Sequence, residues 1–168
     1  LLTKIKGLIK YTAPKIFINV KNIDNTAVIL FTSGSEAMPK AVPLTHTNII
    51  SDLYGTVFSL GLKQNQILLG FLPPFHSFGF TVLFILPLVS GLKVAYTPDP
   101  TDSFEIVRMI RHTRTNIIVS APSFLKHILA GSTAYDLSTI QLVVSGAESM
   151  SVSIKEKFDY LTKNALVL

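Results

Sequence analysis

The chain alternates short apolar runs with amphipathic segments, and this alternation constrains its fold more than any other feature. Apolar runs of strand length occupy residues 26–31, 67–72, 92–96, 116–120 and 140–144. The segments between them carry apolar residues every three or four positions, which is the period of a helix with one buried face. A run that is apolar throughout indicates a strand covered on both sides. We therefore expect an α/β fold with a mainly parallel sheet and helices on both faces.

Capping residues and prolines place the expected helix ends. Helix starts are predicted from Thr45, from Asp102 with Glu105, from Pro122, and from Ser153 with Glu156. Gly61 and Gly131 are expected to end two of these helices. Residues 78–89 are almost entirely apolar, but they are shorter than the ~20 residues that a membrane-spanning helix needs, and they include Pro87. We expect them to form a buried helix rather than a membrane anchor.

Composition excludes several classes of protein. The chain of 168 residues is long enough for one domain with a real core, and 48% of it is hydrophobic against 15% charged. It has no cysteine, so neither a disulfide framework nor a thiolate nucleophile is available. Its first residues lack the apolar core and cleavage site of a secretory signal. We expect a cytoplasmic protein.

Lysines gather at the start of the chain, and the net charge is +5. They are Lys4, Lys6, Lys10, Lys15 and Lys21. Such a segment is either a solvated surface or a docking surface for anionic lipid or an acidic protein. No interleaving of arginine with aromatic residues and no zinc pattern indicates nucleic acid, so we expect no nucleic-acid partner. We interpret residues 1–25 as a basic lead-in, the tail of a preceding part, and residues 26–168 as a separate domain.

A loop of hydroxyl groups follows the first apolar run. It contains Thr32, Ser33, Gly34, Ser35, Glu36, Ala37 and Lys40. In such a loop, backbone N–H groups and hydroxyls donate hydrogen bonds to phosphate, and the ammonium offsets its charge. The common nucleotide-binding pattern Gly-x-x-x-x-Gly-Lys-Ser/Thr is absent, because Pro39, Lys40 and Ala41 stand where its end would be. The loop therefore indicates phosphate binding unlike that of the common ATPases, and its alternative is a serine-rich turn without a ligand.

Two further segments follow apolar runs, at the strand ends where α/β sheets bind ligands. The first contains Phe75, His76 and Phe78. A histidine there can line the boundary between an apolar pocket and a phosphate, although a purely structural histidine is the alternative. The second contains Ser145, Gly146, Ala147 and Glu148. Its glycine lets a flat ligand approach the backbone, and an ordinary turn is the alternative.

Other chemistries find less support in the sequence. No Gly-x-Ser-x-Gly elbow surrounds any serine, so a hydrolase nucleophile is not indicated. His46, His112 and His127 lack the spacing of metal ligands, and we expect them at the surface. Glu36 and Glu148 are the only acids in the candidate segments, too few to predict a metal site within the chain.

Together the three segments resemble the adenylate-forming enzymes, also called AMP-binding or acyl-activating enzymes. Their phosphate loop reads roughly Thr-Ser-Gly-Ser/Thr-Thr/Glu-Gly-x-Pro-Lys-Gly-Val, from which this chain departs at Ala37 and Ala41. The family's Pro-Leu-Phe-His-x-x-Gly matches residues 73–79 apart from Pro74, and its Gly-Ala-Glu or Gly-Ala-Pro turn matches residues 146–148. The Ser-Glu form of the loop is most similar to the acyl–acyl carrier protein synthetase domain of bifunctional acyltransferase/synthetase enzymes of bacterial phospholipid repair, and the chain also resembles long-chain acyl-CoA synthetases.

The resemblance implies a reaction and a role for each segment. A fatty acid would react with ATP to give acyl-adenylate and pyrophosphate, and the thiol of acyl carrier protein or coenzyme A would then take the acyl group. The hydroxyl loop, from Thr32 to Lys40, would hold the phosphates. His76 would lie between acyl group and phosphate, Phe75 and Phe78 would line the acyl pocket, and residues 145–148 would form a wall of the adenine and acyl sites. Mg²⁺ would accompany ATP, with its ligand beyond residue 168.

The resemblance also implies that residues 26–168 are a partial AMP-binding domain, from the large N-terminal domain of such an enzyme. The Tyr-Gly-x-Thr-Glu segment, the ribose-binding aspartate and the C-terminal domain with its catalytic lysine are expected after residue 168. We therefore expect the chain alone to be inactive, and the whole protein to be cytoplasmic or to associate with the inner face of a membrane. The alternative is a non-catalytic domain of the same fold, used for protein or lipid contact. Acyl chain length, acceptor and oligomeric state stay open.

Overall fold

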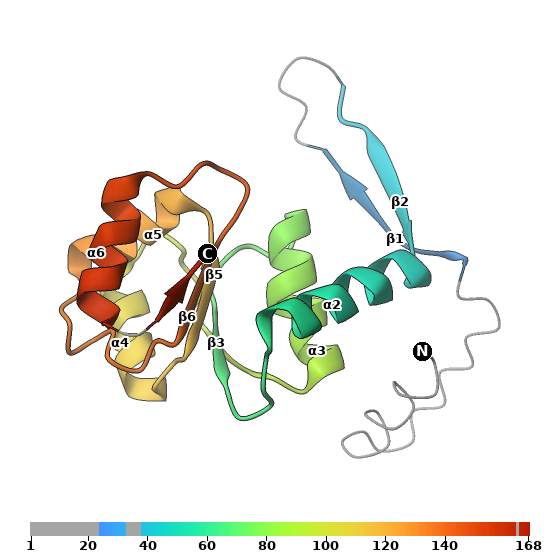
Figure 1. The fold of residues 1–168 in the computed structure, drawn as a ribbon. Helices are drawn as coiled ribbons and strands as arrows, with labels where there is room; N and C mark the ends of the chain where they lie inside the picture. The colour runs from blue at the N-terminus through green and yellow to red at the C-terminus, as the bar shows by residue number, and fades with distance from the viewer. Residues whose placement is uncertain (1–23, 33–37, 164) are drawn as a thin grey trace. The chain divides into compact units, whose positions relative to one another are not determined.

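The computed structural model describes residues 24–32, 38–163 and 165–168, which belong to two compact units (Figure 1). The first unit comprises residues up to Leu62 together with Leu88–Gly91, and the second comprises Lys63–Pro87 and Leu92–Leu168. The basic lead-in predicted for residues 1–25 lies almost wholly outside the described residues, as do residues 33–37 of the hydroxyl loop.

The second unit is built on a five-stranded parallel sheet with the strand order β4-β3-β5-β6-β7. Its strands are β3 (Ile67–Gly70), β4 (Lys93–Tyr96), β5 (Ile117–Ser120), β6 (Leu142–Ser145) and β7 (Leu166–Val167). All of the residues of the central strand β5 are buried, as expected for a strand covered on both faces. The apolar runs therefore predicted β3, β4, β5 and β6 correctly, with ends that differ by one or two residues.

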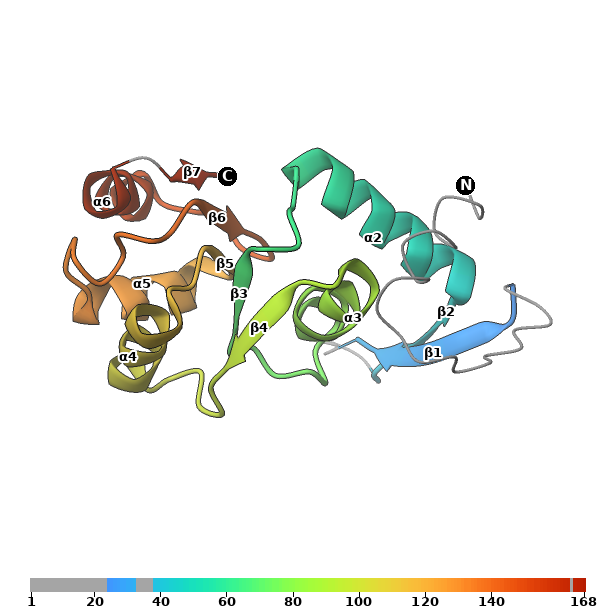
Figure 2. The same cartoon turned by 90° about the horizontal axis from the view of Figure 1, so that it is seen from below.

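Helices cover both faces of this sheet (Figure 2). On one face lie α4 (Ser103–Thr113), α5 (Pro122–Gly131) and α6 (Val152–Thr162), and on the other lies the helical segment η1 (Gly79–Ile85). The apolar sides of α4, α5 and α6 join the strands in a single core that includes Ile106, Ile110, Ile118, Ile128, Val143 and Phe158. Each fully buried side chain of this size contributes about 1.5–3 kcal/mol, so the core fixes the positions of the strand ends. The α/β prediction is confirmed.

The apolar helix expected at residues 78–89 begins as a π-helix, η1, and continues as α3 (Leu86–Ser90). Pro87 has no N–H, so it cannot donate to the Leu83 carbonyl as an α-helical residue would. The Tyr96 hydroxyl at the end of β4 donates to that carbonyl instead. The predicted helix is confirmed, but its complete burial is wrong: Phe84 is 46% exposed, since only one side of η1 is buried.

The first unit contains an antiparallel hairpin and a long helix. The hairpin pairs β1 (Thr26–Phe31) with β2 (Ala41–Thr45), and the helix α2 (His46–Leu60) follows directly. The Thr45 hydroxyl accepts the Asn48 N–H at 3.1 Å, and Gly61 ends the helix with a left-handed φ of 59°, so both predicted ends are confirmed. The expected burial of the first strand is wrong, because Ile29 is 53% exposed: among the described residues β1 pairs with β2 alone, which leaves a two-stranded ribbon.

The two capping boxes predicted later in the chain have different outcomes. The Asp102 carboxylate accepts the Glu105 N–H at 3.0 Å, so the start of α4 is confirmed. The cap predicted at Ser153 is wrong, because the N-cap of α6 is Ser151. Ser151 has the extended backbone that an N-cap requires, whereas Ser153 already lies in the first helical turn, with its hydroxyl 3.1 Å from that of Ser151.

Candidate active site

The carboxyl end of the parallel sheet is where ligands bind in open α/β folds, and two of the predicted segments lie there. The segment with His76 follows β3, and the turn with Gly146 follows β6. Because β5 lies between these strands, both segments emerge from the same edge of one sheet. The fold of the second unit therefore brings both segments to the carboxyl edge of the sheet.

The backbone around His76 forms a tight turn between β3 and η1. The His76 N–H donates to the Pro73 carbonyl at 3.3 Å, and the His76 carbonyl accepts the Phe80 N–H at 2.8 Å. The imidazole is exposed, and its ring lies 4.7 Å from that of Phe75 at an angle of 45°. The turn thus holds the backbone of His76 on both sides while its side chain stays open to a ligand.

Gly79 explains why this turn needs a glycine three residues after the histidine. A Cβ atom at Gly79 would lie 2.2 Å from the Pro73 carbonyl oxygen, a distance that no real side chain tolerates. The first turn of η1 therefore packs directly against the backbone that leads into it. A substitution at Gly79 would displace His76, which is fixed by the same carbonyl.

The structure brings the second and third predicted segments into contact. The Phe78 ring lies 3.3 Å from the position that a Cβ atom of Gly146 would occupy. The Gly146 N–H donates to the Ser120 carbonyl at 3.1 Å, which ties the turn to β5. Phe78 is therefore a wall beside the turn, and Gly146 is needed for close approach of that ring rather than for positive φ.

The turn itself contains a strained residue. Ala147 has φ 68°, a left-handed conformation that residues with a Cβ atom rarely adopt. The next residue, Glu148, is engaged by α5: its carboxylate accepts the Ser123 hydroxyl at 3.1 Å and the Ser123 N–H at 3.3 Å. The predicted wall residues 145–148 thus form a defined turn with contacts on two sides.

A cavity of about 630 Å³ opens beside the histidine segment, at the ends of β3 and β4. It is lined by residues 70–75 with Gly79, Leu83, Phe84, Tyr96, Thr97 and Pro98. Of the two predicted acyl-pocket residues, Phe75 lines this cavity, and it is 76% exposed, whereas Phe78 packs at Gly146. Partial burial raises the pKa of the Tyr96 hydroxyl, which remains a hydrogen-bond donor at physiological pH.

Three buried hydroxyls at this edge have no hydrogen-bond partner among the described residues. They belong to Thr97 after β4, Ser120 at the end of β5 and Ser145 at the end of β6. Buried hydroxyls in proteins are usually paired, so three at the carboxyl ends of strands in one sheet mark this edge as a place where a polar ligand would gain partners. Sequence reasoning named Ser145 and missed the other two, although each closes or follows an apolar run.

The hydroxyl loop lies in the first unit, at the tip of the hairpin. Its base is described: the Thr32 N–H donates to the Lys40 carbonyl at 3.0 Å, and the Thr32 hydroxyl accepts the Lys40 N–H at 3.1 Å. Both residues are exposed. Ser33, Gly34, Ser35, Glu36 and Ala37 lie outside the described residues, so their predicted phosphate contacts stay predictions.

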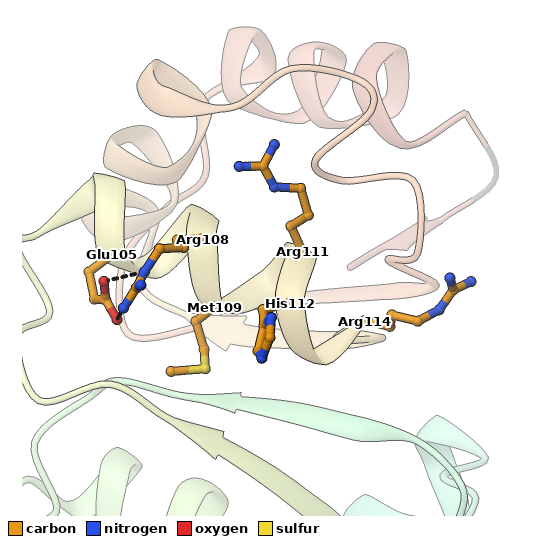
Figure 3. Close-up of a pocket in the computed structure, with 6 residues that line it drawn as sticks. All are labelled: Glu105, Arg108, Met109, Arg111, His112 and Arg114. Atoms are coloured by element: carbon orange, nitrogen blue, oxygen red, sulfur yellow. Dashed lines mark hydrogen bonds and ion pairs between the residues drawn. The ribbon is translucent and has the colours of Figure 1, made fainter.

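A second hollow, of about 640 Å³, lies along α4 (Figure 3). Two of its arginines are paired with carboxylates. The Arg108 guanidinium donates two hydrogen bonds of 2.8 Å to the Glu105 carboxylate and lowers its pKa, and the Arg111 guanidinium lies 3.5 Å from the Asp136 carboxylate. The end of α4 with Arg111 leads into β5, so it lies near the opposite, amino end of the sheet. This hollow is therefore separate from the candidate site.

The described residues contain neither a cluster of metal ligands nor a membrane-spanning helix. No group of three or more histidine or carboxylate side chains comes together in them that could hold a metal ion. No helix in the same residues is both long and apolar enough to cross a bilayer.

The three histidines expected at the surface differ in exposure. His112 and His127 are exposed, as expected, and His46 is half-buried at the start of α2.

The parallel sheet and its helices define an α/β domain, and comparison with known proteins identifies its family. The AMP-binding enzyme family matches residues 10–168. The chain belongs to this family, as its three segments predicted.

Its curated relatives include acid–CoA ligases. A long-chain-fatty-acid–CoA ligase of Bacillus subtilis is 29% identical over 145 residues, which cover 84% of this chain and 26% of the relative. A 4-coumarate–CoA ligase of Arabidopsis thaliana, number 3, is 30% identical over 142 residues, which cover 79% of this chain and 25% of the relative. The chain thus spans about a quarter of the length of the curated relatives it matches.

Solved structures agree with the fold. Apo MatB from Rhodopseudomonas palustris superposes with a TM-score of 0.77 and 22% identity, covering 87% of this chain and 28% of MatB. The ATP-bound form of MatB gives the same TM-score and identity, covering 86% of this chain and 29% of MatB.

Proposed function

We propose that this chain is part of an ATP-dependent ligase that converts a fatty acid to its acyl-adenylate and then transfers the acyl group to a thiol. One observation carries the proposal: the Phe78 ring lies against Gly146, so two family segments far apart in sequence meet at the carboxyl edge of the sheet. The family match and the fatty-acid–CoA ligase among the relatives support the same reaction class.

Each part of the site has a proposed role. The hairpin loop from Thr32 to Lys40 binds the phosphates of ATP, and its hydroxyls and ammonium suit that task. Residues 145–148 border the adenine, since they form a turn at the carboxyl edge of the sheet and Ala147 within it is exposed. His76 lies by the reacting carboxylate, and the apolar cavity beside Phe75 takes part of the acyl chain. Such chemistry depends on positioning and on charge neutralisation.

The proposed reaction also requires a nucleotide with its metal ion and an acceptor thiol. ATP is used with Mg²⁺, whose ligand is supplied beyond residue 168. The acceptor thiol belongs to coenzyme A or to acyl carrier protein, and the relatives named as CoA ligases favour coenzyme A as the first acceptor to test. The protein acts in the cytoplasm, and the lysines of residues 1–25 offer contact with an anionic membrane surface.

The test is ATP–pyrophosphate exchange by the whole protein that contains this chain, measured with fatty acids of graded length. We expect exchange that depends on the fatty acid, followed by thioester formation with coenzyme A or carrier protein, and none with the 168-residue chain alone. His76→Ala should lower turnover about a hundredfold through lost positioning, and the matched change of an exposed helical histidine, His127→Ala, should not. Absence of ATP–pyrophosphate exchange with every acid would overturn the proposal in favour of a non-catalytic domain. Turnover by the 168-residue chain alone would overturn the proposal that it is only part of the ligase.

A further inference from the structure

The helix α5 begins without a capping side chain of its own. Its N-cap is Ala121, which has no side-chain oxygen, and Pro122 occupies the first helical position. The N–H of Ser123 is one of the groups that a helix leaves without an internal partner at its start. Glu148, from the turn after β6, accepts that N–H at 3.3 Å and the Ser123 hydroxyl at 3.1 Å. A carboxylate distant in sequence therefore supplies the missing cap, where the helix dipole favours negative charge.

The same carboxylate is adjacent to the strained residue of the candidate site. Ala147 keeps φ 68°, and strain of this kind persists only where the surroundings over-determine it. The Phe78 ring at Gly146 fixes one end of the turn, and the Glu148–Ser123 pair fixes the other. Both Glu148 oxygens accept from Ser123, so the carboxylate is committed to α5 rather than free for a ligand.

We propose that Glu148 is a positioning residue: by capping α5 it holds Ala147 in its left-handed conformation and so sets the place of the wall at residues 145–148. This inference rests on the proposed function, in which that wall borders the adenine of ATP. Glu148 then acts on nucleotide binding through Ser123 and the backbone, without touching the base.

The first test uses the chain itself and needs no activity. In Glu148→Ala the Ser123 amide should exchange with solvent at least about fivefold faster, as expected for the loss of one hydrogen bond. The backbone resonances of Gly146 and Ala147 should shift with it. The matched control is Glu156→Ala, an exposed glutamate on α6, which should change neither. Unchanged Ser123 exchange in Glu148→Ala would overturn the capping role.

The second test uses the whole ligase and compares ATP with inosine triphosphate, whose base lacks the exocyclic amino group. Glu148→Ala should raise the KM for ATP about tenfold and Ser123→Ala about fivefold, with kcat little changed. The two changes together should cost no more than Glu148→Ala alone, and the preference for ATP over inosine triphosphate should stay as in the wild type. Loss of that preference in Glu148→Ala, with Ser123→Ala unaffected, would show direct base contact and overturn the inference. If the wild-type ligase shows no ATP–pyrophosphate exchange, the proposed function fails. Hydrogen exchange at the Ser123 amide still tests the capping role in that case.

Discussion

The hairpin and the parallel sheet are built from similar apolar residues but bury them differently. Every residue of β5 is buried in the sheet, whereas Phe31 at the end of β1 is 71% exposed. The sheet has helices on both faces, whereas in the described part of the chain the hairpin has two strands. Since an isolated two-stranded ribbon is marginal in water, the sheet carries most of the stability of the described residues.

The same contrast separates the parts of the candidate site. The turn at residues 145–148 and the His76 segment emerge from the sheet, and the base of the hydroxyl loop belongs to the hairpin. Ligand-binding loops are commonly drawn from the less stable parts of a protein, because they must adapt to what they bind. The comparison predicts that changes in the sheet unit will cost stability, and that equal changes in the hairpin will not.

The largest expected effect compares two phenylalanines. Phe158 of α6 is fully buried in the core, so Phe158→Ala should destabilise the chain by about 3–5 kcal/mol. Phe31→Ala removes the same side chain from the hairpin and should cost no more than about 0.5 kcal/mol. Urea unfolding followed by circular dichroism measures both. Equal losses would show that the hairpin is as well packed as the sheet.

The next effect concerns a glycine at the candidate site. Gly79→Ala places a methyl group against the Pro73 carbonyl and should cost about 3 kcal/mol, because the backbone must move. The control is Gly131→Ala at the end of α5, where the nearest atom to the new Cβ is 3.6 Å away, an ordinary contact. Thermal melts measure the stability of both variants. Unchanged stability in Gly79→Ala would mean that the turn around His76 relaxes easily.

A smaller effect depends on pH. Hydrogen bonds from the Thr133 hydroxyl, at 2.7 Å, and from its N–H, at 2.9 Å, lower the pKa of Asp136, and Arg111 adds to this. A carboxylate with a lowered folded pKa stabilises the fold above its unfolded pKa of about 3.9, and this contribution is lost as the pH falls through the folded value. Asp136→Asn should therefore cost about 1–2 kcal/mol at neutral pH, and the difference should shrink in acid. A difference that does not depend on pH would contradict the ionised state of Asp136.

Much of this fold follows from the sequence, for physical reasons that differ between regions. Buried strands are apolar on both faces, so β3, β5 and β6 were predictable within one or two residues. Local caps such as Thr45 and Asp102 act within a few residues of their helix, so they were predictable too. The exposure of β1 was not, because an apolar run indicates a strand without showing how many neighbours cover it.

The candidate site likewise has features that the sequence predicts and features that it does not. The glycine of the His76 segment and the turn at Gly146 could be named from short patterns. The cap that Glu148 gives to α5 and the hydrogen bond from Tyr96 to Leu83 could not, because each joins residues that only the folded sheet brings together. The sequence predicts the cap of α6 at Ser153 because Glu156 follows three residues later, whereas the extended backbone that makes Ser151 the N-cap is seen only in the folded chain.

The smallest expected effect tests whether the two regions unfold independently. Gly55 lies in the middle of α2, and a Cβ atom there would meet nothing within 4 Å. Alanine is the better helix former, so Gly55→Ala should stabilise α2 by about 0.5–1 kcal/mol. Hydrogen exchange measures this at individual amides: exchange should slow in α2 and stay unchanged in β5 if the two units open separately. Slower exchange by the same factor in β5 would mean that hairpin and sheet unfold as one cooperative unit, and the stability of the sheet would then extend to the base of the hydroxyl loop.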